Sequence, residues 1–119
     1  YAAISALKNG DPDVAMMRES YNQRRRFLLH AFAEMGIECF EPKGAFYTFP
    51  NIKRFGMTSD EFANRLLQEE KLALVPGNAF MVDEEAPCGS FRMNFSTPTP
   101  ENIVKGVSVM AGVLAAQGL

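Results

Sequence analysis

The residues of this chain best suited to chemistry lie in one short stretch, CGSFRMNFS, at positions 88 to 96. Side chains alternate between the two faces of a strand, so a strand here would have one apolar face and one polar face. The apolar face comprises Phe91, Met93 and Phe95, and the polar face comprises Arg92, Asn94 and Ser96. The guanidinium of Arg92 is a planar fork of donors that matches a carboxylate, so this strand could bind an organic acid.

Two interpretations of Arg92 remain open on this strand alone. A charge in mid-strand is disfavoured unless it is paired or reaches water, so Arg92 is either a surface residue on a wet sheet face or a ligand-binding group. No other pattern offers a self-contained active site, because the sequence holds no nucleophile elbow, phosphate loop or dinucleotide motif. We predict no metal site, since His30 is the sole histidine and the acidic run 83–85 is expected to face solvent.

Composition limits the remaining classes. The chain has 119 residues, a length typical of one domain. Its net charge of −2 does not favour a nucleic-acid or anionic-membrane partner. No apolar run approaches the roughly 18 residues of a membrane span. Cys39 and Cys88 are far apart and fit two reduced thiols in a cytoplasmic protein. The sequence lacks an initiator methionine, so we expect a fragment of a longer protein.

Periodicity predicts the elements that position Arg92. Helices are expected over 1–8, 11–36, from 58 and from 99, and strands over 37–40, 45–49, 72–75 and around 92. Segments 37–40 and 45–49 are expected to pair as a hairpin, with 50–56 as a loop. This order gives an α+β fold, a small, mostly antiparallel sheet with helices packed on one face.

Details of the helices are also predicted. Gly10 is expected to stop the first helix in the left-handed conformation, with Asp11 capping the next. Thr58 and Glu61 form a capping box. Several apolar side chains are expected to face inward, and Arg24, Arg25 and Arg26 to form a solvated, salt-bridged face. The inward set comprises Val14, Met17, Tyr21, Leu28, Phe32, Met35, Phe62, Leu66, Leu67, Ile103, Val107, Met110 and Leu114.

Three segments in order carry a resemblance: PKGAFYTFPNI (42–52), LALVPGNAF (72–80) and SFRMNFSTP (90–98). Together they are similar to the carboxy-terminal small domain of fold-type I, class I/II pyridoxal-phosphate-dependent aminotransferases, nearest to the aspartate and aromatic aminotransferase-like subgroup. The opening YAAISALKNGD resembles the segment of those enzymes that leaves the large domain. The resemblance favours the ligand-binding interpretation of Arg92.

The resemblance implies roles for individual residues. Arg92 would bind the substrate α-carboxylate, and Asn94 would face the same cleft. Gly44, Ala45 and Phe46 would approach the substrate, while the loop 76–80 would lie at the mouth of the cleft. No catalytic or cofactor-binding residue is expected in this chain. Met81, where the family often has glycine, and the segment 86–90 depart from the family pattern.

The resemblance also implies the surroundings of the chain. Residues 1–10 would end the connecting helix from an absent large domain, and residues 11–119 would form the small domain. Pyridoxal 5′-phosphate would be bound by that large domain, so this fragment alone would be inactive. The full-length enzyme would be a cytoplasmic homodimer that transfers amino groups between an L-amino acid and a 2-oxo acid, without nucleic-acid or membrane partners.

The sequence also leaves other functions to consider beside aminotransfer. A stand-alone small-molecule-binding or interaction module could use Arg92 as an anion site, but the ferredoxin-like order β-α-β-β-α-β differs from this chain, which opens with helices. A dimerisation domain would favour an apolar outer sheet face, which the polar residues of the Arg92 strand contradict. Within the aminotransferase fold, β-elimination remains an alternative reaction.

Overall fold

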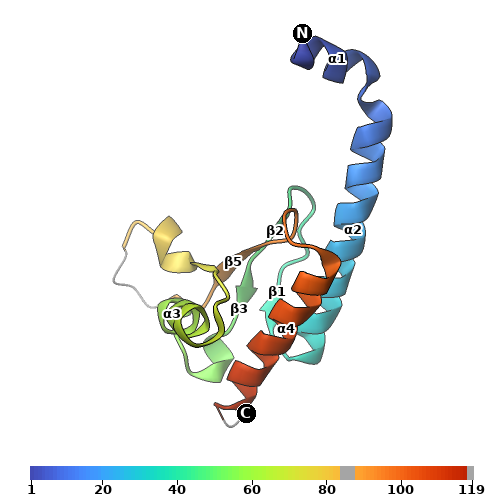
Figure 1. Cartoon of the computed structure of the whole chain (residues 1–119). Helices are drawn as coiled ribbons and strands as arrows, with labels where there is room; N and C mark the ends of the chain where they lie inside the picture. The colour runs from blue at the N-terminus through green and yellow to red at the C-terminus, as the bar shows by residue number, and fades with distance from the viewer. Residues whose placement is uncertain (84–87, 118–119) are drawn as a thin grey trace.

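The computed structural model, which describes residues 1–83 and 88–117, contains helices and short strands, and the strands form a two-stranded and a three-stranded antiparallel sheet (Figure 1). The helices are α1 (Ala2–Asn9), α2 (Asp11–Glu34), α3 (Ser59–Glu70) and α4 (Pro100–Ala115). The strands are β1 (Glu38–Cys39), β2 (Tyr47–Thr48), β3 (Pro50–Asn51), β4 (Val75–Pro76) and β5 (Phe91–Asn94). Two 3₁₀ turns, η1 (Lys53–Phe55) and η2 (Gly77–Phe80), complete these elements, and the α+β prediction is confirmed.

The strand that carries Arg92 lies at the centre of the three-stranded sheet. β5 pairs antiparallel with β2 on one side and with β4 on the other. In this register Tyr47 lies opposite Asn94, and Val75 lies opposite Arg92. A central strand is hydrogen-bonded along both edges, so it holds its side chains more firmly than an edge strand or a loop.

The predicted hairpin between 37–40 and 45–49 is wrong. β1 pairs instead with β3, where Cys39 lies opposite Pro50, in a segment that we expected to be a loop. β2 is taken by β5, a partner more than forty residues away in sequence. This pairing turns Thr48 into the core, where it is 1% exposed and its hydroxyl donates to the carbonyl of Met93. Long-range burial therefore decides the pairing over the local turn sequence 41–44.

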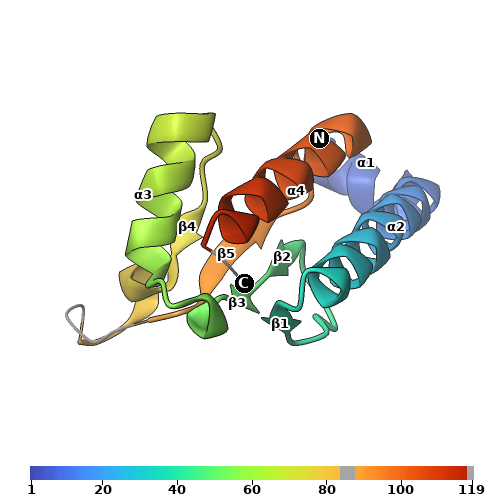
Figure 2. The same cartoon turned by 90° about the horizontal axis from the view of Figure 1, so that it is seen from below.

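The helices α2, α3 and α4 cover one side of the strands, as the view in Figure 2 shows. The apolar face of β5 points toward them, so that Phe91, Met93 and the following Phe95 are all buried. Other buried side chains come from each of the three helices, namely Leu28, Phe32, Phe62, Leu66, Ile103, Met110, Val113 and Leu114. The division of this strand into an apolar and a polar face is confirmed.

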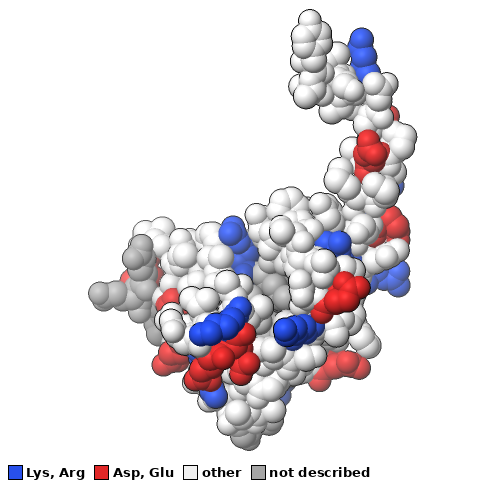
Figure 3. All heavy atoms as spheres, in the orientation of Figure 1, with Lys and Arg blue, Asp and Glu red and all other residues white. Residues whose placement is uncertain are grey.

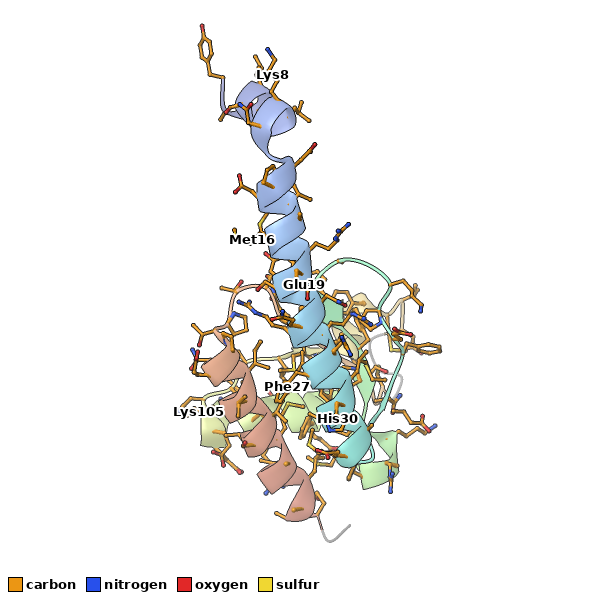
Figure 4. The ribbon with its side chains drawn as sticks, turned by 90° about the vertical axis from the view of Figure 1, so that its right-hand side faces the viewer. Lys8, Met16, Glu19, Phe27, His30 and Lys105 are labelled. Carbon is orange, nitrogen blue, oxygen red and sulfur yellow. The ribbon has the colours of Figure 1, made fainter. Side chains whose placement is uncertain are left out.

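The first helix and the start of the second project from this body as an arm (Figure 1). Nothing in α1 is buried, and the buried residues of α2 are Leu28, Ala31 and Phe32, near its carboxyl end. Figure 4 shows Lys8 and Met16 on the arm and Phe27 beside α4. The prediction that Val14 and Met17 face the core is wrong, because the sheet does not reach that far along α2.

Two capping details at Gly10 also differ from the prediction. Gly10 has φ −83°, a right-handed conformation, and not the left-handed one expected of a helix stop. Gly10 itself is the N-cap of α2, and Asp11 is the first helical residue. The amide of Gly10 donates to the carbonyl of Ala6, so the chain passes from one helix to the next with little interruption.

In helix α3 the predicted capping box is confirmed, and the predicted burial of Leu67 is wrong. Its capping box is present, since Glu61 N donates to Thr58 Oγ1 and Thr58 N donates to Glu61. Phe62 and Leu66 are fully buried, as predicted, but Leu67 is 46% exposed and lies outside the core. A position one residue after Leu66 is rotated by about 100° around the helix axis, which carries Leu67 to the edge of the apolar face.

The carboxyl end of α3 offers a test of backbone strain. Lys71 ends the helix at φ 59°, a left-handed conformation that costs a non-glycine residue about 1 kcal/mol. We expect Lys71→Gly to raise the free energy of unfolding by up to about 1 kcal/mol, measured by urea denaturation of the chain. The matched control Gln68→Gly, inside the same helix, should lower it by about 0.5–1 kcal/mol. Destabilisation by both variants would contradict this account.

Candidate substrate-carboxylate site

Arg92 lies half-buried on the face of β5 that points away from the helices. Its guanidinium carbon is 4.5 Å from the ring centroid of Tyr47 and 5.0 Å from that of Phe80. Within residues 1–83 and 88–117, no carboxylate pairs with it and no oxygen accepts a hydrogen bond from it. An arginine held by rings alone keeps its N–H donors available to a ligand.

The two rings that contact Arg92 form what we call the aromatic clamp, Tyr47 and Phe80. Tyr47 belongs to β2 and Phe80 ends η2, the turn that follows β4, so each neighbour of β5 supplies one ring. The sequence placed Phe80 in a loop at the mouth of a cleft, and the alternation Tyr47-Thr48 could have indicated an outward Tyr47. Their shared contact with Arg92 was missed, because neither ring is near Arg92 in sequence.

Each ring of the clamp is backed by another ring. The centroid of Phe46 lies 4.8 Å from that of Tyr47, and the centroid of Phe49 lies 5.9 Å from that of Phe80, in an edge-to-face arrangement. Such aromatic pairs stabilise one another beyond the apolar area that they bury. Phe46 also packs against the core cluster, so this residue has both a structural and a site-lining position.

Asn94 lies on the same face, but part of its side chain is already engaged. Its Oδ1 accepts hydrogen bonds from the amide and the hydroxyl of Ser96, at 2.6 and 2.9 Å. These bonds fix the turn in which β5 ends. The Nδ2 group is therefore the part of Asn94 that could donate to a bound ligand.

The turn after β5 is also held from α2 by an arginine. Arg24 Nη1 donates to the carbonyls of Phe95 and Ser96, at 3.1 and 2.8 Å. The expectation that all three successive arginines form a solvated face is therefore wrong for Arg24, which is half-buried. Its spacing of three from Tyr21 and four from Leu28 was the available signal, since these positions share one helical face.

Gly44, Ala45 and Phe46 line a different hollow, a groove of about 600 Å³ between α2 and the segment 41–46. Arg92 is not among its lining residues, so the predicted site residues divide between this groove and the outer sheet face. The two places adjoin where the ring of Phe46 packs at a tilt against the ring of Tyr47. Ala45 has φ 60°, a conformation that is strained in any residue with a Cβ and that is common at functional sites.

Three charged side chains of the groove, Arg25, Glu41 and Lys43, are paired with one another. Glu41 accepts hydrogen bonds from Lys43 Nζ and Arg25 Nη1, each at 2.9 Å. These two cations hold the pKa of the Glu41 carboxyl below its usual value, and the hydrogen bond from Lys43 has the larger effect. The segment 41–46 is thus tied to α2 by an ion pair, although the exposure of these side chains limits its contribution to stability.

Gly77 shows why the loop 76–80 takes the path that brings Phe80 to Arg92. Its amide donates to the carbonyl of Ser90 at 2.8 Å, directly against the strand. A Cβ at this position would lie 2.6 Å from Cys88 Sγ and closer still to the Ser90 carbonyl oxygen. Glycine is needed here for close approach of two backbones.

Other predicted features fall outside the site. Cys39 and Cys88 are free thiols, and partial burial raises the pKa of Cys39. Over the parts of the chain that the structure describes, no helix could cross a bilayer, and no three metal-ligating side chains gather. Residues 84 and 85 of the acidic run, and residues 86 and 87, lie outside the described residues. Figure 3 shows acidic and basic side chains interspersed over one face.

Solved structures share this fold over almost the whole chain. An aromatic aminotransferase from Pyrococcus horikoshii superposes with a TM-score of 0.87 at 36% identity, covering 99% of this chain and 31% of that one. An aspartate aminotransferase of Pyrococcus abyssi is 42% identical over 99 residues, which are 82% of this chain and 25% of that protein. An aromatic-amino-acid aminotransferase of Thermococcus litoralis is 39% identical over the same number of residues.

These likenesses define the class of the chain as part of an aminotransferase fold. The model of the family "Aminotransferase class I and II" matches residues 1–110, and the chain belongs to this family. The chain spans about a quarter of the length of the curated relatives that it matches.

Proposed function

We propose that this chain is the small domain of a pyridoxal-phosphate-dependent aminotransferase and that Arg92 binds the α-carboxylate of its substrate. In this proposal residues 1–10 end the connection from a large domain, and residues 11–119 form the small domain. The observation that carries it is the state of the Arg92 guanidinium, which is held between two rings without an acidic partner among residues 1–83 and 88–117. A half-buried cation without an anion is the arrangement expected of a site that receives one.

The remaining predicted residues support the same site from two sides. Asn94 would offer its Nδ2 group to the bound carboxylate, next to the fork of Arg92. Gly44, Ala45 and Phe46 would approach the substrate from the groove that adjoins Tyr47. With its carboxylate fixed in two hydrogen bonds, an amino acid cannot rotate freely, and such positioning lowers the barrier of a reaction at the α-carbon.

The cofactor of the family, pyridoxal 5′-phosphate, supplies the electron sink that makes the α-proton acidic. The residues described here do not fit its covalent anchorage. Lys43 is the one lysine that lines the groove, and its ammonium is ion-paired to Glu41 and largely exposed. We therefore assign cofactor binding to a large domain of the same enzyme. A second copy, an L-amino acid and a 2-oxo acid are its other proposed partners, in a cytoplasmic setting.

A spectroscopic experiment tests the proposed function directly. The complete coding sequence is expressed, and the absorption of the protein is recorded between about 320 and 450 nm before and after addition of single amino acids. We expect a yellow protein that bleaches with a subset of amino donors and regains its colour with 2-oxo acids. Formation of pyruvate and ammonia instead would indicate β-elimination. A colourless protein that ignores pyridoxal phosphate would contradict the proposal and favour a stand-alone anion-binding module.

A further inference from the structure

Binding of a carboxylate requires more than an available arginine, because a long side chain must first be fixed in one rotamer. We propose that Tyr47 and Phe80, the aromatic clamp, are positioning residues that fix the Arg92 guanidinium before the substrate arrives. The clamp thereby sets the affinity of the site for a carboxylate. This inference rests on the proposed function of Arg92 and extends it to two residues on other elements.

The chemistry of the contact distinguishes a clamp from an ordinary ion pair. A carboxylate of the protein would also hold Arg92 in place, but it would occupy the N–H donors and compete with the ligand. An aromatic ring attracts the cation through its π-face and accepts no strong hydrogen bond. Tyr47 and Phe80 therefore reduce the freedom of the guanidinium while they leave its donors unoccupied.

The fold brings the rings of Tyr47 and Phe80 to Arg92 from opposite sides of β5. Tyr47 lies opposite Asn94 in the register of β2 with β5, which makes it a diagonal neighbour of Arg92 on the outer face. Phe80 arrives from the other side, through β4 and the tight approach of Gly77 to Ser90. The packing of Phe46 on Tyr47 and of Phe49 on Phe80 limits the motion of both rings.

The test uses the full-length enzyme and propionate, a carboxylate without an amino group, as a competitive inhibitor. We expect Tyr47→Leu and Phe80→Leu each to raise the inhibition constant of propionate by about fivefold, since each removes one cation–π contact. The ring-preserving variants Tyr47→Phe and Phe80→Tyr should stay within about twofold of the parent. Phe40→Leu is the matched control, because Phe40 is 93% exposed and does not contact Arg92.

A second arm asks whether the rings act through Arg92. In an Arg92→Gln background, Tyr47→Leu and Phe80→Leu should leave the inhibition constant unchanged, whereas a general loosening of the sheet would weaken binding in both backgrounds. Equal effects in the two backgrounds would overturn the inference, as would a loss of affinity in the ring-preserving variants. A thermal melting curve of each variant shows that the inhibition constants are compared between folded proteins.

The two proposals fail in different ways. If Arg92→Gln weakens propionate binding and the leucine variants do not, the clamp is wrong while the proposed role of Arg92 stands. If Arg92→Gln leaves propionate binding unchanged, Arg92 is not the carboxylate ligand, and the inference falls with it.

Discussion

Replacement of Arg92 by alanine should lower kcat/KM of the full-length enzyme for its amino donor by about 2–4 kcal/mol, or roughly 30- to 1,000-fold. The guanidinium lies half-buried on the central strand, and no carboxylate in the described parts of the chain pairs with it, so its charge is available to the substrate. Its removal leaves the substrate carboxylate desolvated and unpaired, which accounts for the size of the effect. Steady-state kinetics with the best donor measures it.

Two variants make this result specific. Arg92→Lys should recover part of the lost kcat/KM and not all of it, because one ammonium cannot form the paired fork. Arg65→Ala is the matched control, since Arg65 pairs with Glu69 on the surface of α3, away from the outer sheet face. Parent-like kinetics in the alanine variant at position 92 would remove Arg92 from the site.

The second large effect concerns stability. Phe62→Ala should lower the free energy of unfolding by about 3–5 kcal/mol, because the ring is 0% exposed and its loss leaves a cavity beneath the sheet. The centroid of Phe62 lies 5.4 Å from that of Phe91, the residue before Arg92, so the substitution removes the support of β5. Urea denaturation of the chain, followed by circular dichroism, provides the measurement.

The neighbouring leucine gives a sharp control for this prediction. Leu67→Ala should cost less than about 1 kcal/mol, because Leu67 is 46% exposed in the same helix. A similar loss from the two variants would mean that Leu67 is buried, as the sequence had suggested, and would contradict the observed packing of α3.

Features set by neighbouring residues could be predicted from the sequence. The period of two in β5 indicated which face would be buried, and the capping box at Thr58 and Glu61 marked the start of α3. In both cases, the physical cause acts between residues a few positions apart in the chain. The same alternation placed Arg92 on the polar face, but its interpretation as a ligand-binding group came from the family resemblance.

Features set by distant residues could not be predicted in this way. Whether β2 pairs with β1 or with β5 depends on burial of Thr48 against residues far along the chain. The burial of Arg24 depends on two carbonyls more than seventy residues away, and the contact of Phe80 with Arg92 depends on how closely Gly77 approaches Ser90. Local patterns carry no information on such long-range pairings.

The alternation of β5 has a consequence for protein engineering. Phe91 and Met93, which stabilise the fold, are interleaved one by one with Arg92 and Asn94, which face the candidate site. Substitutions at Arg92 can therefore be screened as a library at little expense to the fold, whereas Asn94 also holds the turn after β5 through Ser96. Insertion or deletion of a single residue would exchange the two faces, bury the guanidinium and expose the aromatic ring, so redesign of specificity must preserve the length of this strand.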